Sequence, residues 1–315
     1  MPLFEMSNQR LKPISETKID LEHDIQKLTE QNLEIIFGLK FVSGISNHEF
    51  CVRSSDQDFF IDTLAFDEEN KSIVLIEYKK DRSFSIIDQG FAYLAAMLNS
   101  KADFVLEINE KLEKNFAKKN IDWEQSRIIF ISNEFTNYQK NAINFRDLPM
   151  FLYEVKIYNN NLIDYNPIKP LGISESINKY IKSKTVRSVA KEIKVFTLED
   201  HLKNKPDKIL GLFQKFQSKI LEFDDSVSEV VKKFYIGYKN NSRFYFATFH
   251  IYINKLQIDL LVEDSHIKDS KKILQKYPDS YGYAKNLKHF DFKIGDDFDY
   301  VFDLIKQSYE FNKNR

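Results

Sequence analysis

Polar residues interrupt one of the most hydrophobic parts of the chain, between Phe59 and Gln89. Asp62 follows an apolar pair, and Glu77 and Lys79 form an E-x-K pair at the end of the run Ile73 to Tyr78. Because side chains alternate between the two faces of a strand, Glu77 and Lys79 share a face with otherwise apolar neighbours. Buried charges cost several kcal/mol unless they pair or bind an ion. The stretch is therefore where we expect chemistry.

Two carboxylates and a lysine with this spacing fit the metal-dependent hydrolysis of a phosphodiester. Asp62, Glu77 and the backbone carbonyl of Tyr78 offer the hard oxygen ligands that Mg²⁺ or Mn²⁺ prefers. The metal would activate a water molecule and screen charge on the phosphate. Lys79 would orient that water and stabilise the transition state. A structural ion-pair cluster, in a fold that binds without cutting, is the alternative for the same residues.

The surrounding segments predict an α/β (α+β) unit that brings these side chains together. An amphipathic helix is expected over 20–37, ended by Gly38, and strands over 59–66 and 72–80 form a hairpin. A helix over 85–99 places Gln89 and Tyr93 on one face. A strand or irregular turn is expected at 41–52, strands at 127–132 and 150–158, and helices at 101–119 and 136–145. This order predicts a mixed sheet flanked by helices in residues 1–158.

The pattern changes after residue 158. Residues 159–196 contain Pro167 and Pro170 and a basic run, which predict a basic linker. That run is either a solvated arm or a DNA-backbone contact through Lys182, Lys184 and Arg187. A smaller α+β domain is expected over 197–315, with helices at 210–223, 226–234, 270–276 and 297–311 and strands at 234–239, 244–253 and 257–263.

Composition excludes several classes of protein. The net charge of −1 lacks the basic excess of a dedicated nucleic-acid binder. One cysteine, Cys51, rules out a disulfide within the chain and any multi-thiolate metal site. The six histidines show no paired metal spacing, and phosphate-binding, dinucleotide and serine-hydrolase motifs are absent from the sequence. With no secretory signal and no apolar run of bilayer length, we expect a cytoplasmic protein that does not enter a membrane.

The stretches IDTLAFD, IVLIEYKK and IIDQGFAYL, preceded by LTEQNLEIIFG and HEF, resemble the PD-(D/E)XK nuclease superfamily. They are most similar to the bacterial and archaeal endonuclease branch with an IEYK strand and a Q-x-x-x-Y helix. The resemblance implies a restriction-endonuclease-like fold and a Mg²⁺-dependent DNA endonuclease, in a restriction or defence setting. It also implies that Glu30 binds the metal or orients its ligands, and that Gln89 and Tyr93 line the site.

Other residues near the motif are weaker candidates. Lys80 and Arg82 follow the E-x-K strand and could meet substrate phosphates, and Glu49 lies in the HEF segment. Endonucleases of this branch commonly carry a basic residue before the Ile-Asp pair, where this chain has Phe60. The three residues Asp62, Glu77 and Lys79 are nevertheless all present.

The segment from about Thr197 resembles a C-terminal domain of unknown function that follows such nuclease domains, in proteins sometimes labelled predicted transport proteins. Nothing in the sequence supports transport. We expect this domain to supply target choice, a protein partner or a homodimer contact. The alternative for the whole chain is a catalytically inactive, nuclease-like module that binds nucleic acid or a protein.

Overall fold

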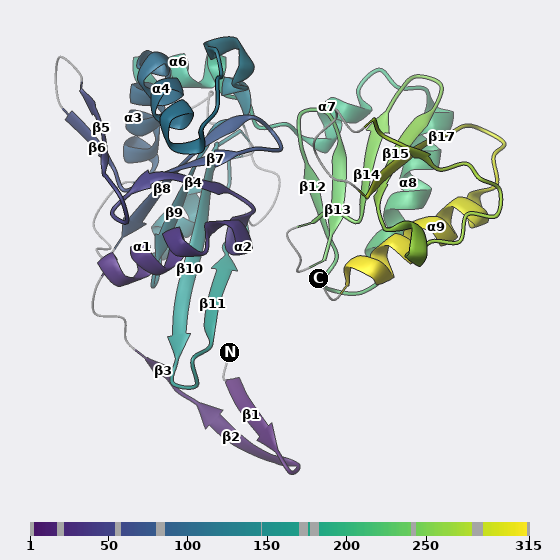
Figure 1. Ribbon diagram of the computed structural model, residues 1–315, viewed down its shortest axis with the longest axis horizontal. Helices are drawn as coiled ribbons and strands as arrows, with labels where there is room; N and C mark the ends of the chain where they lie inside the picture. Colours follow the sequence, from purple (N-terminus) through teal and green to yellow (C-terminus); the bar gives the residue numbers. More distant parts are fainter. Residues whose placement is uncertain are drawn as a thin grey trace. The chain divides into compact units, whose positions relative to one another are not determined.

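The chain folds into two units, Met1–Val195 and Phe196–Arg315, and each is described by itself. The computed structural model describes residues 3–17, 22–53, 58–79, 86–145, 147–169, 176, 183–240, 244–278 and 286–313. Both units combine helices with a multi-stranded sheet (Figure 1), which confirms the α+β class.

The first unit is built on a seven-stranded mixed sheet whose strand β8 (Ser72–Lys79) is central. Its path is β11-β10-β9-β8-β7-β4, and β3 also pairs with β10. Strands β8, β9 and β10 are parallel, and the other pairings are antiparallel. The remaining strands are β3 (Glu16–Thr17), β4 (Lys40–Gly44), β7 (Thr63–Asp67), β9 (Arg127–Ser132), β10 (Met150–Tyr158) and β11 (Ile163–Pro167).

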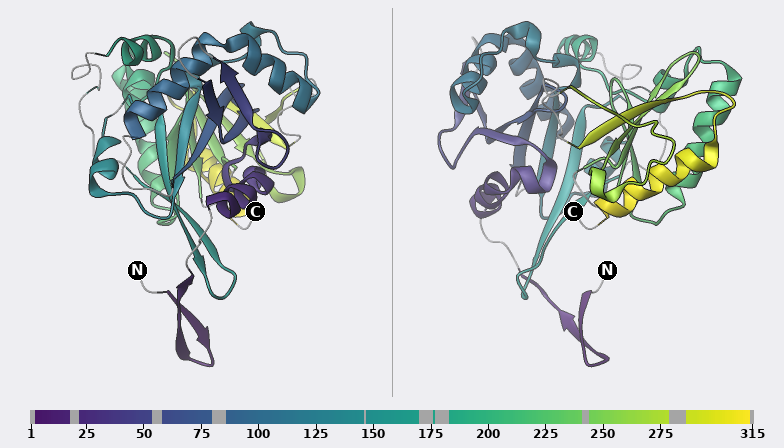
Figure 2. Two further views of the ribbon diagram at one scale, coloured as in Figure 1. Left: turned by 90° about the vertical axis from the view of Figure 1, so that its left-hand side faces the viewer. Right: turned by 45° about the vertical axis from the view of Figure 1, so that its right-hand side comes forward.

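The two faces of β8 pack against different helices, because its side chains alternate. Ile73 and Leu75 belong to the core that includes buried residues of α3, α4 and α6, whereas Val74, Ile76 and Tyr78 pack with α1 and α2. Figures 1 and 2 show these two groups of helices on opposite sides of the sheet. The Glu77 side chain therefore lies on the α3 side of the sheet. The helices are α1 (Glu22–Gln31), α2 (Leu33–Phe37), α3 (Ile86–Asn99), α4 (Lys101–Leu112), α5 (Asn137–Ala142) and α6 (Lys184–Glu192).

The helix expected over 20–37 is divided in two at Asn32. The Asn32 side chain donates a 2.8 Å hydrogen bond to the Leu28 carbonyl, and its backbone amide bonds to Thr29. Asparagine competes with the helical backbone in this way. Gly38 ends α2 with a φ of 69°, in the left-handed conformation expected of a C-cap glycine.

The described parts of the segment expected to be a linker, 159–169 and 183–195, belong to the first unit and contain a strand and a helix, which differs from that prediction. Strand β11 pairs with β10, and α6 buries Val186 and Val189 in the same core as α3. Ile193, just beyond α6, is buried there too. These three residues have helical spacing, which the many charges around them obscured.

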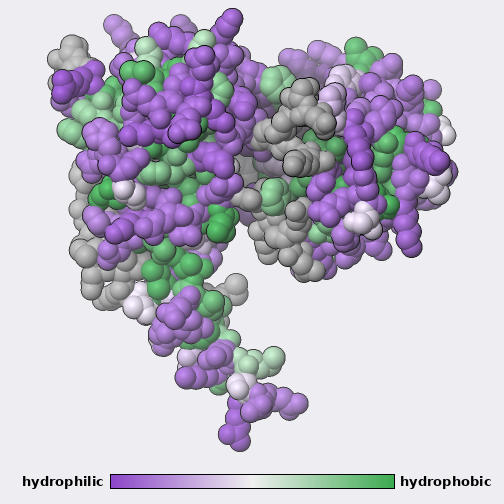
Figure 3. Space-filling view, viewed as in Figure 1, coloured by the Kyte–Doolittle hydropathy of each residue, from purple (hydrophilic) through white to green (hydrophobic). Residues whose placement is uncertain are grey.

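Two hairpins in the first unit were not expected. Strands β1 (Leu3–Ser7) and β2 (Arg10–Ile14) form an exposed hairpin that lies away from the sheet in every view (Figures 1 and 2). Strands β5 (Phe50–Arg53) and β6 (Asp58–Ile61) form the other. The β10–β11 hairpin, which also pairs with β3, exposes Leu162 and Ile163. Figure 3 shows a hydrophobic group over this part of a mostly hydrophilic face.

The second unit has a six-stranded antiparallel sheet in the order β12-β13-β14-β15-β17-β16. Its core joins the sheet to α8 and α9. The segment 226–234, expected to be helical, contains strand β12, and the segment 270–276, also expected to be helical, contains a turn and the two-residue strand β16. The elements are α7 (Leu198–Leu202), α8 (Asp207–Leu221), β12 (Ser228–Val231), β13 (Ile236–Lys239), β14 (Ala247–Ile251), β15 (Leu256–Leu261), β16 (Gln275–Lys276), β17 (Leu287–Phe292) and α9 (Phe298–Asn312).

None of the helices within the described ranges is both long enough and apolar enough to cross a membrane.

The packing of α6 predicts that Val189→Ala destabilises the first unit by about 1–3 kcal/mol, because a fully buried side chain leaves a cavity. Urea unfolding followed by far-UV circular dichroism measures the effect. Lys191→Ala, on the exposed side of the same helix, is the control and should change stability by less than about 0.5 kcal/mol. Equal effects of the two substitutions would mean that α6 is not part of this core.

Candidate functional site

Asp62 closes the end of the ladder between β7 and β8. Strand β7 begins at Thr63, which pairs with Ile76, while the preceding Ile61 pairs in the β5–β6 hairpin. Two residues after Ile76 on β8, the Tyr78 amide donates a 2.9 Å hydrogen bond to Asp62 Oδ2. The carboxylate therefore takes the place of a strand carbonyl, which fixes it beside the end of β8.

Glu77 is the centre of the polar cluster. Its Oε1 accepts hydrogen bonds from Lys79 Nζ at 2.7 Å, from Gln89 Nε2 at 2.9 Å and from Tyr93 OH at 3.5 Å. Its side chain is only 7% exposed. Gln89 and Tyr93 come from α3, one turn apart, so the helix supplies two donors to one oxygen. The structure thus brings together Asp62, Glu77, Lys79, Gln89 and Tyr93.

Burial of two neighbouring carboxyl groups favours the retention of a proton by the pair. Burial, followed by the charge of Glu77, raises the pKa of Asp62 from 3.8 to about 7. Burial also raises the pKa of Glu77, against the opposing charge of Lys79. Burial and the Glu77 charge raise the pKa of Tyr93, which keeps its hydroxyl a donor.

Glu30 lies on the other side of the sheet. Its Oε1 accepts hydrogen bonds from Thr63 at 2.7 Å, Gln26 at 3.0 Å and the Ile45 amide at 3.1 Å. Its Oε2 accepts from the amide of Ser46 at 2.9 Å and from the Ser46 hydroxyl. The residue is 4% exposed. Both carboxylate oxygens of Glu30 therefore accept hydrogen bonds from the turn after β4 and fix its position.

Glu30 does not lie beside Glu77 and Lys79, so of the two roles that the resemblance implied, metal ligand or ligand-orienting residue, only the second fits this arrangement. Thr63 shares a face of β7 with Ala65, which packs in the α1 core, whereas Glu77 projects towards α3. Glu30 acts on Asp62 indirectly, because Gln26 Nε2 donates to both Glu30 and the Asp62 carbonyl, the latter at 2.7 Å. Glu30 is thus placed as a positioning residue.

Three residues of this second network were missed from the sequence. They are Gln26, Thr63 and Gly44. A Cβ atom at Gly44 would lie 2.2 Å from Glu30 Oε1 and 2.8 Å from the Asp62 carbonyl oxygen. Gln26 stands four residues before Glu30, a helical spacing that could have identified it. A glycine at the end of a strand is the other available signal.

Apart from Tyr93, which contacts Glu77, the remaining candidates are exposed or fall outside the described residues. Lys80, Arg82 and Lys182 fall outside the residues that the structure describes. Lys184 and Arg187 are exposed on α6. Tyr93 touches Glu77 directly, and its ring packs edge-on against Phe59. Two further residues of the motif region, Glu49 and Phe60, are exposed.

The donor set suits a hard divalent cation. Across the described residues, no three or more His, Cys, Asp or Glu side chains lie together as a metal site. Asp62 and Glu77 supply two carboxylates, and Mg²⁺ is usually held by one or two carboxylates together with water and substrate phosphate. Burial is the first cause of both raised pKa values, and the charge of Lys79 opposes it only in part. A divalent cation would add positive charge here, with the Tyr78 carbonyl as a further oxygen ligand.

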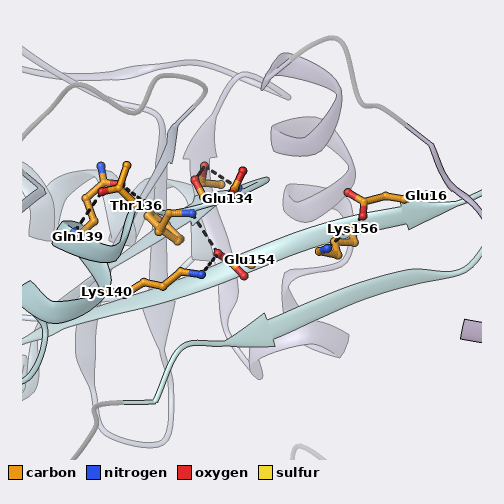
Figure 4. A network of polar contacts seen from close by, with 9 residues as sticks. Glu16, Glu134, Thr136, Gln139, Lys140, Glu154 and Lys156 are labelled. Atoms are coloured by element: carbon orange, nitrogen blue, oxygen red, sulfur yellow. Dashed lines mark hydrogen bonds and ion pairs between the residues drawn. The ribbon is translucent and has the colours of Figure 1, made fainter. Parts of the chain in front are cut away.

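The polar edge continues across the parallel strands. Lys79 of β8 is in register with Ser132 of β9, which is in register with Glu154 of β10. Figure 4 shows Glu154 between Lys140, at 2.7 Å, and the loop after β9, where its carboxylate accepts the Phe135 amide at 3.0 Å; Lys156, further along β10, pairs with Glu16 at 3.0 Å. Ligands of α/β sheets commonly bind at this carboxyl edge.

The pKa of Asp62 predicts a pH-dependent gain in stability for Asp62→Asn. The folded protein keeps a proton that the unfolded chain releases above pH about 4, so this contribution to stability is lost as pH rises to about 7. Asparagine cannot ionise and can still accept the Tyr78 amide. At pH 8 without metal we expect a gain of roughly 1–3 kcal/mol, since one pKa unit is worth about 1.4 kcal/mol.

Urea unfolding at pH 8 and pH 4 in a chelating buffer measures this gain, which should nearly vanish at pH 4. Asp164→Asn, at an exposed position of β11, is the control. A loss of stability of equal size at both pH values would contradict the retention of a proton by the pair.

Comparison with known proteins supports the C-terminal expectation. Residues 198–312 match the family described as a domain of unknown function (DUF5655). The whole chain is similar to an uncharacterized protein of Haemophilus influenzae, with 33% identity over 309 residues that cover 98% of this chain and 99% of the relative. No solved structure matches. The chain belongs to the same family as the Haemophilus influenzae protein, and its second unit contains the DUF5655 domain.

Proposed function

We propose that the first unit is a Mg²⁺- or Mn²⁺-dependent endonuclease that hydrolyses phosphodiester bonds of DNA. The observation that carries this proposal is the convergence of Asp62, Glu77 and Lys79 at the end of a buried central strand, where burial raises the pKa of both carboxyl groups. The resemblance of the motifs to PD-(D/E)XK endonucleases gives the reaction and the substrate. A restriction or defence role in the cytoplasm is part of the same proposal.

Each residue has a distinct task in the proposed reaction. Asp62 and Glu77 would hold the cation, and Lys79 would orient the attacking water and stabilise charge that develops on the phosphate. A bound Mg²⁺ supplies an activated water and neutralises phosphate charge. Gln89 donates to Glu77 Oε1 and fixes the direction of its carboxylate. Tyr93 supports the same oxygen from the next helical turn.

The position of Lys79 suits this task. Its Nζ lies 2.7 Å from Glu77 Oε1, and its side chain is 16% exposed. The ammonium group is therefore beside the carboxylate that would bind the metal and still reaches the surface. A buried ion pair contributes little net stability, so a pair placed here is better explained by chemistry than by folding.

The proposal predicts that Glu77→Ala and Lys79→Ala each lower DNA cleavage by at least about 100-fold, because each removes a group that acts on the transition state. A plasmid cleavage assay with Mg²⁺ or Mn²⁺ measures the rate. The first unit offers a matched control, the exposed pair of Glu34 and Lys40 at 2.9 Å. Glu34→Ala and Lys40→Ala should leave the rate unchanged. Unchanged cleavage by both site variants would overturn the proposal.

Metal binding separates this enzyme from an inactive, nuclease-like binding module. Calorimetric titration of the protein with Mn²⁺ should show saturable binding that Glu77→Gln weakens by at least about tenfold. Gln89→Ala should weaken it less, because Gln89 only orients the carboxylate. Absence of saturable binding, together with no cleavage of any DNA tested, would favour the binding module.

A further inference from the structure

The two faces of the sheet in the second unit differ. One face packs against the hydrophobic core, and the other carries aromatic rings, imidazoles and polar side chains. Phe249, Ile258 and Phe290 face the core that α8 and α9 complete, and all three are at most 2% exposed. The residues between them alternate to the opposite face. There His250 of β14 and His289 of β17 lie on either side of β15, and both are half-buried.

A buried carboxylate organises this second face. Asp259 of β15 is 6% exposed and stands directly opposite His289 in the strand register. It accepts hydrogen bonds from Tyr277 OH at 3.0 Å, from Gln257 Nε2 at 3.2 Å and from His250 Nε2 at 3.2 Å. One acceptor thus fixes a tyrosine on one side and an imidazole on the other.

Five rings lie on this face in two groups. Tyr277 and His289 lie nearly parallel, with ring centres 4.4 Å apart and planes at 35°. Tyr235 contacts both Tyr245 and His250, each with centres 5.8 Å apart. All five residues are half-buried. We call them the ring face.

The Tyr245 ring packs against the backbone of Gly237. A Cβ atom at Gly237 would lie 2.5 Å from Tyr245 Cδ1, so only glycine leaves room for it. The rings of the ring face are held in place and remain partly accessible, unlike Phe249 and Phe246 on the core face, which are fully buried.

We propose that the ring face stacks successive unpaired bases of a single-stranded nucleic acid. Aromatic side chains on an open sheet face bind bases by stacking, whatever the sequence, because every base has a π face. The hydrogen bonds of Asp259 hold two rings in advance, which lowers the ordering cost of binding. Gln257 and Asp259 add groups that can meet base edges. Among the described residues no metal-binding group of side chains forms here.

This inference deepens the proposed function, since it gives the nuclease a second contact with its substrate. It does not require cleavage, because the stacking residues lie in a different unit from Glu77.

The test is fluorescence anisotropy of the full-length protein with a labelled single-stranded DNA of roughly 12 nucleotides, a length within the usual site size. A chelating buffer prevents cleavage. Tyr277→Leu and Tyr235→Leu should each weaken binding about tenfold or more, as expected for a lost stacking partner. Tyr277→Phe keeps the ring and should bind within about threefold of the wild type.

Several results would overturn the inference. They are no binding by the wild type, unchanged binding by both leucine variants, or an equal loss in Tyr277→Phe and Tyr277→Leu. Equally tight binding of the matched duplex or of a mononucleotide mixture would also exclude a single strand as the ligand. Near-UV circular dichroism of each variant checks that the unit is folded. Glu34→Ala, at an exposed position of the first unit, should bind like the wild type. Because binding is measured in a chelating buffer and cleavage with metal, loss of stacking and loss of cleavage are read separately.

Discussion

The first unit depends on the need to bury both faces of β8. Five of its side chains are apolar or aromatic and pack on two opposed cores, so a shift by one residue would move each set into the core shaped for the other. The same alternation fixes Glu77 on the α3 face, where burial is unfavourable for a charged carboxylate. Lys79 and Gln89 are the partners that the chain provides for it.

The second network of the first unit sets the position of the backbone rather than the charge. Glu30 ties α1 to the turn after β4, and Gln26 extends that tie to the Asp62 carbonyl. Asp62 is therefore held from both sides of the sheet, by its carbonyl on one and its carboxylate on the other. A glycine at position 44 is the steric condition for that contact.

The fold class and the relative positions of most motif residues could be predicted from the sequence, whereas several individual elements could not. The alternation in β8 placed Glu77 and Lys79, and the helical spacing of Gln89 and Tyr93 placed both on one face of α3. Glu30 could not be placed, because a glutamate on an amphipathic helix gives no sign of which neighbour it contacts. The helix α6 was missed because its charges outweighed three apolar positions, and β12 because its short apolar run fits both periods. The β1–β2 hairpin could not be predicted, because nearly all of its side chains are exposed and its sequence therefore lacks an alternation of buried and exposed residues.

The junction at Val195 and Phe196 has a consequence for how such proteins can evolve. It falls after α6 has completed the first core and before α7 begins the second, and the DUF5655 match starts at residue 198. A recombination event at this point cuts neither a strand ladder nor a helix. The same second unit can therefore be joined to a different N-terminal domain, or lost, while each hydrophobic core stays whole.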